Sequence, residues 1–144
     1  MVPPLPCLVG VVLGWACDRF WPWPLGPYGT VLPIGIALSV VIVVLVVWLM
    51  RAFGRHATSP DPKEETTAIA DTGPFRFSRN PAYVSAALLQ ATLGVFLNTV
   101  WIVLLVLPAM VVVHHVVVLR EEAYLEALFG AEYLYYKSRV RRWL

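Results

Sequence analysis

Long apolar runs separated by short polar segments divide the chain. The clearest run extends from Thr30 to Phe53, and Ser39 is its only polar side chain between Val31 and Met50. About 20 apolar residues in a helix cross a hydrocarbon core of roughly 30 Å. Three shorter runs of the same kind cover Pro4–Phe20, Pro81–Leu97 and Val100–Leu119. The pattern predicts an all-α, polytopic membrane protein with four transmembrane helices.

Local signals at the ends of these runs predict how the helices are connected. Asn80 suits an N-cap and Pro81 suits the first helical position, so a helix is expected to start there. The short turn at Leu97–Thr99 predicts that the last two spans form a helical hairpin. Pro108 lies inside the last span and is expected to kink it. Gly10 and Gly14 in the first span allow close contact with a neighbouring helix.

Composition agrees with a membrane protein and adds an orientation. Of the 144 residues, 59% are hydrophobic and 14% are charged, whereas soluble domains carry about 25% charged residues. Length predicts a single domain covering residues 1–144. Ten basic residues fall between the second and third spans or after the fourth: Arg51, Arg55, Lys63, Arg76, Arg79, Arg120, Lys137, Arg139, Arg141 and Arg142. The positive-inside rule therefore predicts that the 54–80 loop and both termini are cytoplasmic.

Two segments outside the spans have their own character. Residues Glu121 to about Ser138 carry apolar groups at helical spacing, and Gly130 is expected to interrupt them. This predicts an amphipathic helix at or beneath the cytoplasmic membrane surface. The polar segment Ser59–Thr72 is either a plain linker or a mobile loop that closes over a site. Cys7 and Cys17 are about 15 Å apart on one helix and are interpreted as small apolar fillers.

Two polar clusters are the candidates for chemistry. The first is Gly73–Tyr83, which contains Arg76 and Arg79; the second begins with Glu121 and Glu122 and continues to Trp143. Because the intervening stretch crosses the bilayer and returns, both clusters are expected at the same membrane face. Carboxylates beside lipid are costly unless they face protein or a wet cavity. Ion pairing with the arginines is one explanation for them, and ligand binding is another; the two are compatible.

Other site chemistries find little support in the sequence. Adjacent helical residues point about 100° apart, so His114 and His115 are poorly arranged to chelate one metal ion. No metal site is therefore predicted. The chain has neither a glycine-rich phosphate loop nor a dinucleotide fingerprint, and nothing in it suggests nucleic-acid binding.

The ordered set of motifs resembles a known superfamily. Gly-Pro-Phe-Arg-x-x-Arg-Asn-Pro-x-Tyr is followed by two spans. Then comes Glu-Glu-x-x-Leu-x-x-x-Phe-Gly-x-x-Tyr-x-x-Tyr-x-x-x-Val-x-Arg-Trp. This order, over about residues 73–143, is similar to that of isoprenylcysteine carboxyl methyltransferases and phospholipid methyltransferases. Two positions depart from the pattern: Asn80 replaces the histidine of eukaryotic members, as in bacterial relatives, and Val140-Arg141-Arg142 replaces a Val-Pro-Arg.

The resemblance implies an S-adenosylmethionine-dependent membrane enzyme with a cytoplasm-facing cofactor pocket, here in a bacterial inner membrane. Carried over by position, Arg142 and Glu122 are the implied catalytic residues, while Arg76, Arg79 and Arg142 are implied in carboxylate contact or pocket closure. The implied cofactor-binding residues are Arg79, Asn80, Pro81, Tyr83, Glu121, Glu122, Tyr133 and Tyr136. The implied acceptor is a lipid or an isoprenylcysteine-like carboxylate. A carboxylate needs no general base, and catalysis would rest on alignment and exclusion of water.

Three alternatives remain open. An amine N-methyltransferase of phospholipids would have to deprotonate its acceptor, and Glu122 could help. Membrane sterol reductases share the C-terminal architecture but use a nicotinamide cofactor. A third possibility is a membrane protein that keeps the fold without catalysis. For the three tyrosines of the C-terminal region, Tyr133, Tyr135 and Tyr136, interfacial anchoring competes with a role in the site.

Overall fold

The computed structural model describes residues 5–55, 69 and 71–144, and within these ranges all regular secondary structure is helical. Most of the predicted 59–72 loop lies outside the described residues. The elements are α1 (Leu5–Phe20), α2 (Tyr28–Arg55), the 3₁₀ turn η1 (Gly73–Arg76), α3 (Pro81–Phe96), α4 (Val100–Leu104), α5 (Val106–Val112), the π-helical turn η2 (Val113–Val118), α6 (Leu119–Phe129) and α7 (Ala131–Arg139).

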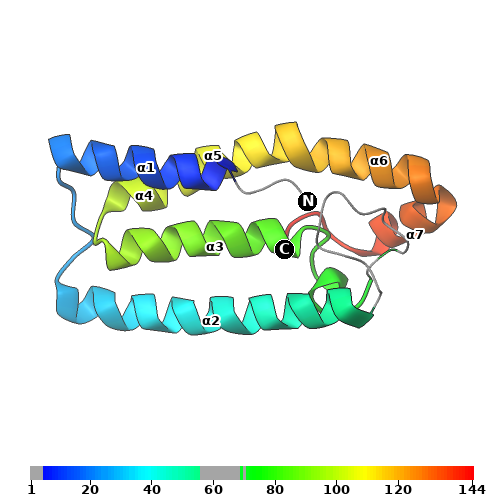
Figure 1. The fold of residues 1–144 in the computed structure, drawn as a ribbon, viewed down its shortest axis with the longest axis horizontal. Helices are drawn as coiled ribbons and strands as arrows, with labels where there is room; N and C mark the ends of the chain where they lie inside the picture. The colour runs from blue at the N-terminus through cyan, green and yellow to red at the C-terminus, as the bar shows by residue number, and fades with distance from the viewer. Residues whose placement is uncertain (1–4, 56–68, 70) are drawn as a thin grey trace.

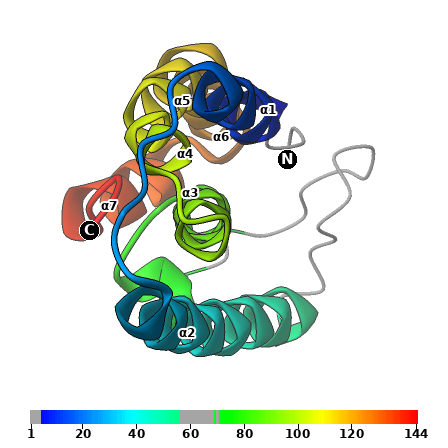
Figure 2. The same ribbon diagram turned by 90° about the vertical axis from the view of Figure 1, so that its left-hand side faces the viewer.

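The helices form an elongated bundle whose two ends differ in composition. Helix α3 lies between α2 on one side and the group of α1, α4 and α5 on the other (Figures 1 and 2). Helix α6 extends this group toward the end where α7, η1 and the C-terminus meet (Figure 1). The opposite end holds the short connections between α1 and α2 and between α3 and α4. The bundle therefore brings the two polar clusters of the sequence to one end.

Two helices are long and apolar enough to cross a membrane. They are Tyr28–Gly54 and the continuous helical stretch Val100–Phe129, with mean hydropathies of 2.9 and 2.7. Helix α3 is apolar but shorter, and α1 has 16 residues. Many large apolar side chains on α1 and α2 are exposed, among them Val12 and Val43 at more than 60%. These exposed faces suit contact with lipid, whereas the prediction of four complete spans remains a prediction.

The helix that carries the predicted fourth span departs from regular α-helix near Pro108 and extends beyond Leu119. The regular α-helical hydrogen bonding is interrupted at Leu105, three residues before Pro108, because proline has no N–H to pair with the carbonyl of Leu104. Beyond it, η2 and α6 continue in one line to Phe129. The helix therefore runs past Leu119 without a stop, because Arg120, Glu121 and Glu122 are good helix formers. That the membrane span ends at Leu119 remains a prediction.

The predicted interruption at Gly130 is confirmed. This residue separates α6 from α7 with a φ of 51°, a conformation that glycine adopts without strain. Because the chain turns here, α7 returns alongside the end of the bundle (Figure 1). The position of this segment at a membrane surface remains a prediction.

Small residues let α1 approach its neighbours closely. A side chain at Gly14 would place its Cβ 2.8 Å from the backbone nitrogen of Ile102 in α4. Gly10 lies against the amide of Gln90, which is 1% exposed and donates to the Ile102 carbonyl at 3.2 Å. The predicted close contacts at both glycines are present, and they bring α1, α3 and α4 together.

The end opposite the polar clusters is fastened by the predicted tight turn. Asn98 adopts a φ of 51°, a region in which asparagine is enriched. Its side-chain oxygen accepts from the backbone N–H groups of Leu25 and Gly26 at 3.0 and 3.3 Å, and its amide donates to the Gly26 carbonyl at 2.9 Å. This one side chain joins the α3–α4 turn to the α1–α2 connection.

Candidate functional site

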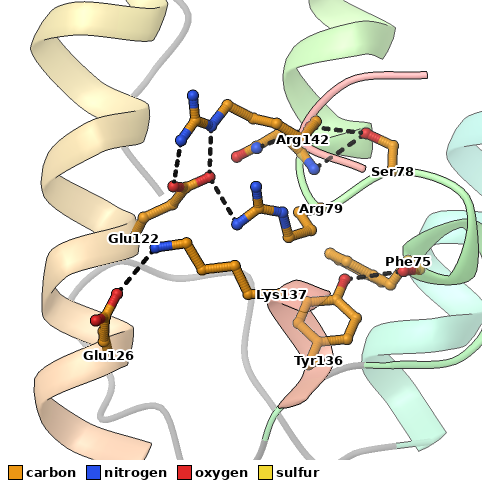
Figure 3. A network of polar contacts seen from close by, with 9 residues as sticks. Phe75, Ser78, Arg79, Glu122, Glu126, Tyr136, Lys137 and Arg142 are labelled. Carbon is orange, nitrogen blue, oxygen red and sulfur yellow. Dashed lines mark hydrogen bonds and ion pairs between the residues drawn. The ribbon is translucent and has the colours of Figure 1, made fainter. Parts of the chain in front are cut away.

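Three segments that are distant in sequence meet at the polar end of the bundle. They are the η1–α3 junction, the first turn of α6, and the C-terminal segment after α7 (Figure 3). Glu122 lies where they meet and is 6% exposed. The structure thus confirms that the two polar clusters are within reach of each other.

Glu122 is held by two arginines. Arg142 donates from Nε and Nη2 to the two carboxylate oxygens, both at 2.9 Å, in a bidentate arrangement. The Nη1 of Arg79 lies 3.1 Å from Oε1 of the same carboxylate (Figure 3). The bond with Glu122 raises the pKa of the Arg142 guanidinium, with burial acting in the opposite direction. Both arginines are therefore charged, and they share a single carboxylate.

Arg79 has unused hydrogen-bonding capacity. Its backbone N–H donates to the Arg141 carbonyl at 2.9 Å, and its side chain is 8% exposed. Among the described residues, neither Nε nor Nη1 has a hydrogen-bond partner, so Nη1 contacts Glu122 only as an ion pair. Buried donors without acceptors are costly and uncommon in proteins. The site can therefore accept a further anionic group at Arg79.

Asn80 occupies the N-cap position of α3 but does not cap the helix with its side chain. Its Nδ2 instead donates to the Arg142 carbonyl at 3.1 Å. Ser78 donates to the same carbonyl at 3.3 Å and accepts from the Asn80 N–H at 3.1 Å. The predicted side-chain cap is therefore wrong, because the C-terminal segment comes close enough to take the amide. Pro81 does begin α3, as expected.

Glu121 and Tyr83 are brought together beside the cluster. The Tyr83 hydroxyl donates to Glu121 Oε1 at 2.9 Å, and the tyrosine is 4% exposed. Its ring packs in a core with Val113, Val117 and Val118. Both adjacent carboxylates of α6 thus contact protein groups, as expected for acidic residues near an apolar span.

Two of the three C-terminal tyrosines face inward. Tyr133 and Tyr136 are 2% and 5% exposed, whereas Tyr135 is 63% exposed. The Tyr136 hydroxyl donates to the Phe75 carbonyl at 2.8 Å. Burial raises the pKa of both hydroxyls; for Tyr133 the nearby Glu122 raises it further, while Arg79 partly lowers it. Both are neutral donors at pH 7, and only Tyr135 suits simple interfacial anchoring.

Arg76 lies apart from the other predicted arginines. It is exposed and lines a cavity of about 550 Å³ together with Asp71, Thr72, Gly73, Tyr136, Arg139 and Val140. Among the residues that the structure describes, neither Glu122 nor Arg142 lines this cavity, and no ion pair joins Arg76 to Glu122. Ser78 was missed by sequence reasoning, although it stands between two singled-out arginines and could have been found by that position.

The fold and the site together define a class of protein. Apolar helices carry, at one end, a buried set of arginine, glutamate and tyrosine side chains that can hold a polar ligand beside a membrane. Residues 30–132 match the family model described as phospholipid methyltransferase. The chain belongs to this family, which is part of the superfamily of integral membrane methyltransferases that includes the isoprenylcysteine carboxyl methyltransferases. It is accordingly a membrane protein, and its family is one of methyltransferases.

Individual relatives add little to the family match. A segment of 33 residues is 54% identical to an uncharacterized protein of Haemophilus influenzae. The segment covers 23% of this chain and 52% of that protein, so the similarity spans about half the length of the relative. No solved structure matches the chain.

Proposed function

We propose that this protein transfers a methyl group from S-adenosylmethionine to the head group of a membrane lipid. The observation that carries the proposal is the buried Arg79 guanidinium, whose Nε and Nη1 have no hydrogen-bond partner among the described residues although Nη1 pairs with Glu122 at 3.1 Å. An arginine whose only role was to pair with Glu122 would not be expected to keep buried N–H groups without acceptors. The family membership supplies the reaction type, and the site supplies a place for a zwitterionic cofactor.

The residues of the cluster fit the polar groups of that cofactor. Its carboxylate would pair with Arg79, whose fork geometry suits a carboxylate. Its ammonium and ribose hydroxyls would be held by Glu121 and Glu122, the adjacent carboxylates that contact Tyr83, Arg79 and Arg142. Tyr133 and Tyr136 would form an apolar wall with neutral hydroxyls. The bound cofactor contributes a methyl group on a sulfonium, which is displaced in line.

Within this proposal, the protein's own residues align and enclose the reactants. Arg142 ties the C-terminal segment to α6, while Asn80 and Ser78 hold the same segment against the start of α3. The distribution of basic residues predicts that this end of the bundle faces the cytoplasm. Once the cofactor has entered from that side, these contacts would keep water out of the site. Methyl transfer gains most from such alignment and from exclusion of water.

The family description favours a phospholipid as the acceptor. An amine is the usual nucleophile of a phospholipid head group that can take a methyl group, so N-methylation is the form of the reaction that we propose. A lipid or isoprenylcysteine-like carboxylate is the alternative outcome of the same assay. A nicotinamide-dependent reductase would bind the nicotinamide cofactor, and a non-catalytic protein would bind neither cofactor. The same binding measurements therefore test both alternatives.

The experiment uses the purified protein in nanodiscs. Calorimetry with S-adenosylmethionine and with a nicotinamide cofactor identifies the ligand, and radiolabelled methyl transfer to phosphatidylethanolamine or to a prenylcysteine identifies the acceptor. We expect binding of S-adenosylmethionine alone and labelled phosphatidylethanolamine. Binding of the nicotinamide cofactor would indicate a reductase, and binding of neither would contradict the proposed function.

Glu122→Gln tests the site at one residue. Loss of its charge should weaken S-adenosylmethionine binding at least tenfold, about 1.4 kcal/mol. The control is Glu126→Gln, one turn along α6, whose carboxylate pairs with the half-exposed Lys137 at 3.0 Å. That variant should bind normally. Because Glu122 is buried between two charges, the unfolding temperature must be measured for both variants. A folded Glu122→Gln protein with unchanged affinity would remove Glu122 from the site.

A further inference from the structure

We infer that His114 is the catalytic base that takes a proton from the acceptor amine, and that the π-helical turn η2 places it there. The inference rests on the proposed function, because only an acceptor that carries a proton needs a base. Glu122 is poorly suited to the task, since both of its oxygens already accept from Arg142 and one also pairs with Arg79.

The π-helical turn changes which histidine shares a helix face with Glu122. In a regular α-helix two turns take about seven residues, which would align His115 with Glu122. A π-helical turn pairs residues five apart and takes up about one extra residue. Here the Leu119 N–H bonds to the His114 carbonyl, five residues back. Two turns then take about eight residues, the separation between His114 and Glu122.

The surroundings of the two histidines agree with this rotation. His115 is exposed, whereas His114 is partly buried and its Nδ1 is inaccessible to solvent. The His114 ring lies 6.0 Å from the ring of Trp143, which directly follows Arg142. His114 is therefore on the side of the helix that faces the C-terminal segment and the Glu122 cluster, and His115 is directed away from it.

The Nδ1 atom of His114 is available as an acceptor. It has no hydrogen-bond partner among the described residues. Its ring contacts among the described residues include His115 at 4.8 Å. On the facing elements, the Tyr83 hydroxyl donates to Glu121 and the Arg142 guanidinium donates to Glu122. Trp143, whose ring lies 6.0 Å from that of His114, packs against the apolar core of Tyr83, Val113 and Val117. A neutral imidazole in this position has one free lone pair and little competition for it.

The position along the helix suits the reaction. Two turns place His114 roughly 11 Å from Glu122, toward the apolar part of the helix. A polar ligand held at Glu122 and a lipid head group arriving from the membrane would thus meet between the two side chains. Histidine is the commonest general base because its unperturbed pKa lies close to neutral pH.

The proposed proton transfer and methyl transfer conserve atoms and charge. His114 Nδ1 takes one proton from the lipid ammonium and becomes imidazolium, leaving a neutral amine. The amine nitrogen donates its lone pair to the methyl carbon, and the carbon–sulfur bond breaks with its electrons remaining on sulfur. The product is a methylated ammonium lipid and a neutral thioether. When product release opens the site to water, the imidazolium loses this proton, so two positive charges enter the step and two remain.

His114→Phe is the test variant and His115→Phe its matched control. Phenylalanine keeps an aromatic ring against Trp143 but cannot accept a proton. We expect His114→Phe to lower methyl transfer to phosphatidylethanolamine at neutral pH about 100-fold, a typical contribution of a general base. Calorimetry should show unchanged S-adenosylmethionine affinity. The loss of methyl-transfer rate in His114→Phe should become smaller as the pH rises, because the lipid amine then loses its proton in solution. His115→Phe should have the same rate as the unsubstituted protein.

A second readout does not depend on turnover. Without cofactor, native mass spectrometry should show weaker binding of phosphatidylethanolamine by His114→Phe but unchanged binding of phosphatidylcholine, whose nitrogen has no proton to donate. A rate defect independent of pH, or equal behaviour of the two histidine variants, would overturn the assignment of His114 while leaving the methyltransferase intact. If the enzyme methylates only carboxylate acceptors, no proton has to be removed, and the assignment of His114 as a base would likewise be overturned. Failure of the unsubstituted protein to bind S-adenosylmethionine would overturn the proposed function and the role of His114 together.

Discussion

Asn80 connects two parts of the chain through a single amide. Its Nδ2 donates to the Arg142 carbonyl, and Ser78 donates to the same oxygen. A side chain used for capping needs an acceptor, whereas this contact needs a donor. The two roles therefore make different demands on the residue, and a substitution can separate them.

Asn80→Asp should destabilise the protein by about 1–2 kcal/mol. A carboxylate retains the ability to cap but cannot donate to the carbonyl, so the Arg142 carbonyl keeps only the weaker bond from Ser78 and faces a charged oxygen. Unfolding by denaturant in detergent measures the change. If Asn80 acted mainly as a cap, the aspartate variant would keep its stability and only Asn80→Ala would lose it.

Residue types predicted much of the site, but not its contacts. Arg79, Glu122 and Arg142 were singled out by motif spacing, and the structure brings all three together. The bidentate pairing of Arg142 and the use of the Asn80 amide could not be predicted. Both depend on how closely the C-terminal segment approaches α3, a distance that is set by packing and not by local sequence.

Close packing between α1 and α4 depends on Gly14. Because an added Cβ would come within 2.8 Å of the Ile102 backbone, Gly14→Ala must push the two helices apart. The expected loss is about 1–3 kcal/mol, as for other overpacked cores. Gly54→Ala is the control, since nothing lies within 4 Å of a Cβ at that exposed helical position.

Thermal unfolding of both variants in the same detergent provides the comparison. Only Gly14→Ala should unfold at a lower temperature. Equal unfolding temperatures would show that α1 can shift without cost, and that it is not held by contact with α4.

Helix boundaries were predictable where a residue imposes them. Pro108 lacks a donor and Gly130 adopts a positive φ, and both interrupt helices as expected. The π-helical turn and the continuation of the helix to Phe129 were not predicted. Valine and histidine fit i→i+4 and i→i+5 bonding equally well, so no residue in Val113–Val118 marks the change.

The whole molecule has two unlike ends, and its orientation can be tested with them. Tyr28 is 66% exposed at the start of α2, and Ser138 is exposed in α7 at the opposite end (Figure 1). The distribution of basic residues predicts that the α7 end is cytoplasmic. In a variant with Cys7 and Cys17 replaced by alanine, Tyr28→Cys should react with an impermeant maleimide on intact cells.

Ser138→Cys should react only after the cells are opened. Labelling of Ser138→Cys from outside, with Tyr28→Cys protected, would reverse the orientation. The apolar runs predicted a helical membrane protein with both polar clusters at one end. They could not predict that α3 lies between α2 and the other helices, because lipid-facing and helix-facing sides of such runs are equally apolar.

The position of Arg142 in the chain has a consequence for biosynthesis. Arg79 and Glu122 leave the ribosome before Arg142 does, and by then both long apolar helices have already been made. Until Arg142 arrives, Glu122 has one cationic partner and the carbonyl acceptor for Asn80 is absent. The contacts that enclose Glu122 therefore depend on a segment that follows both long apolar helices in the chain, and a nascent chain that stops before residue 142 would lack them.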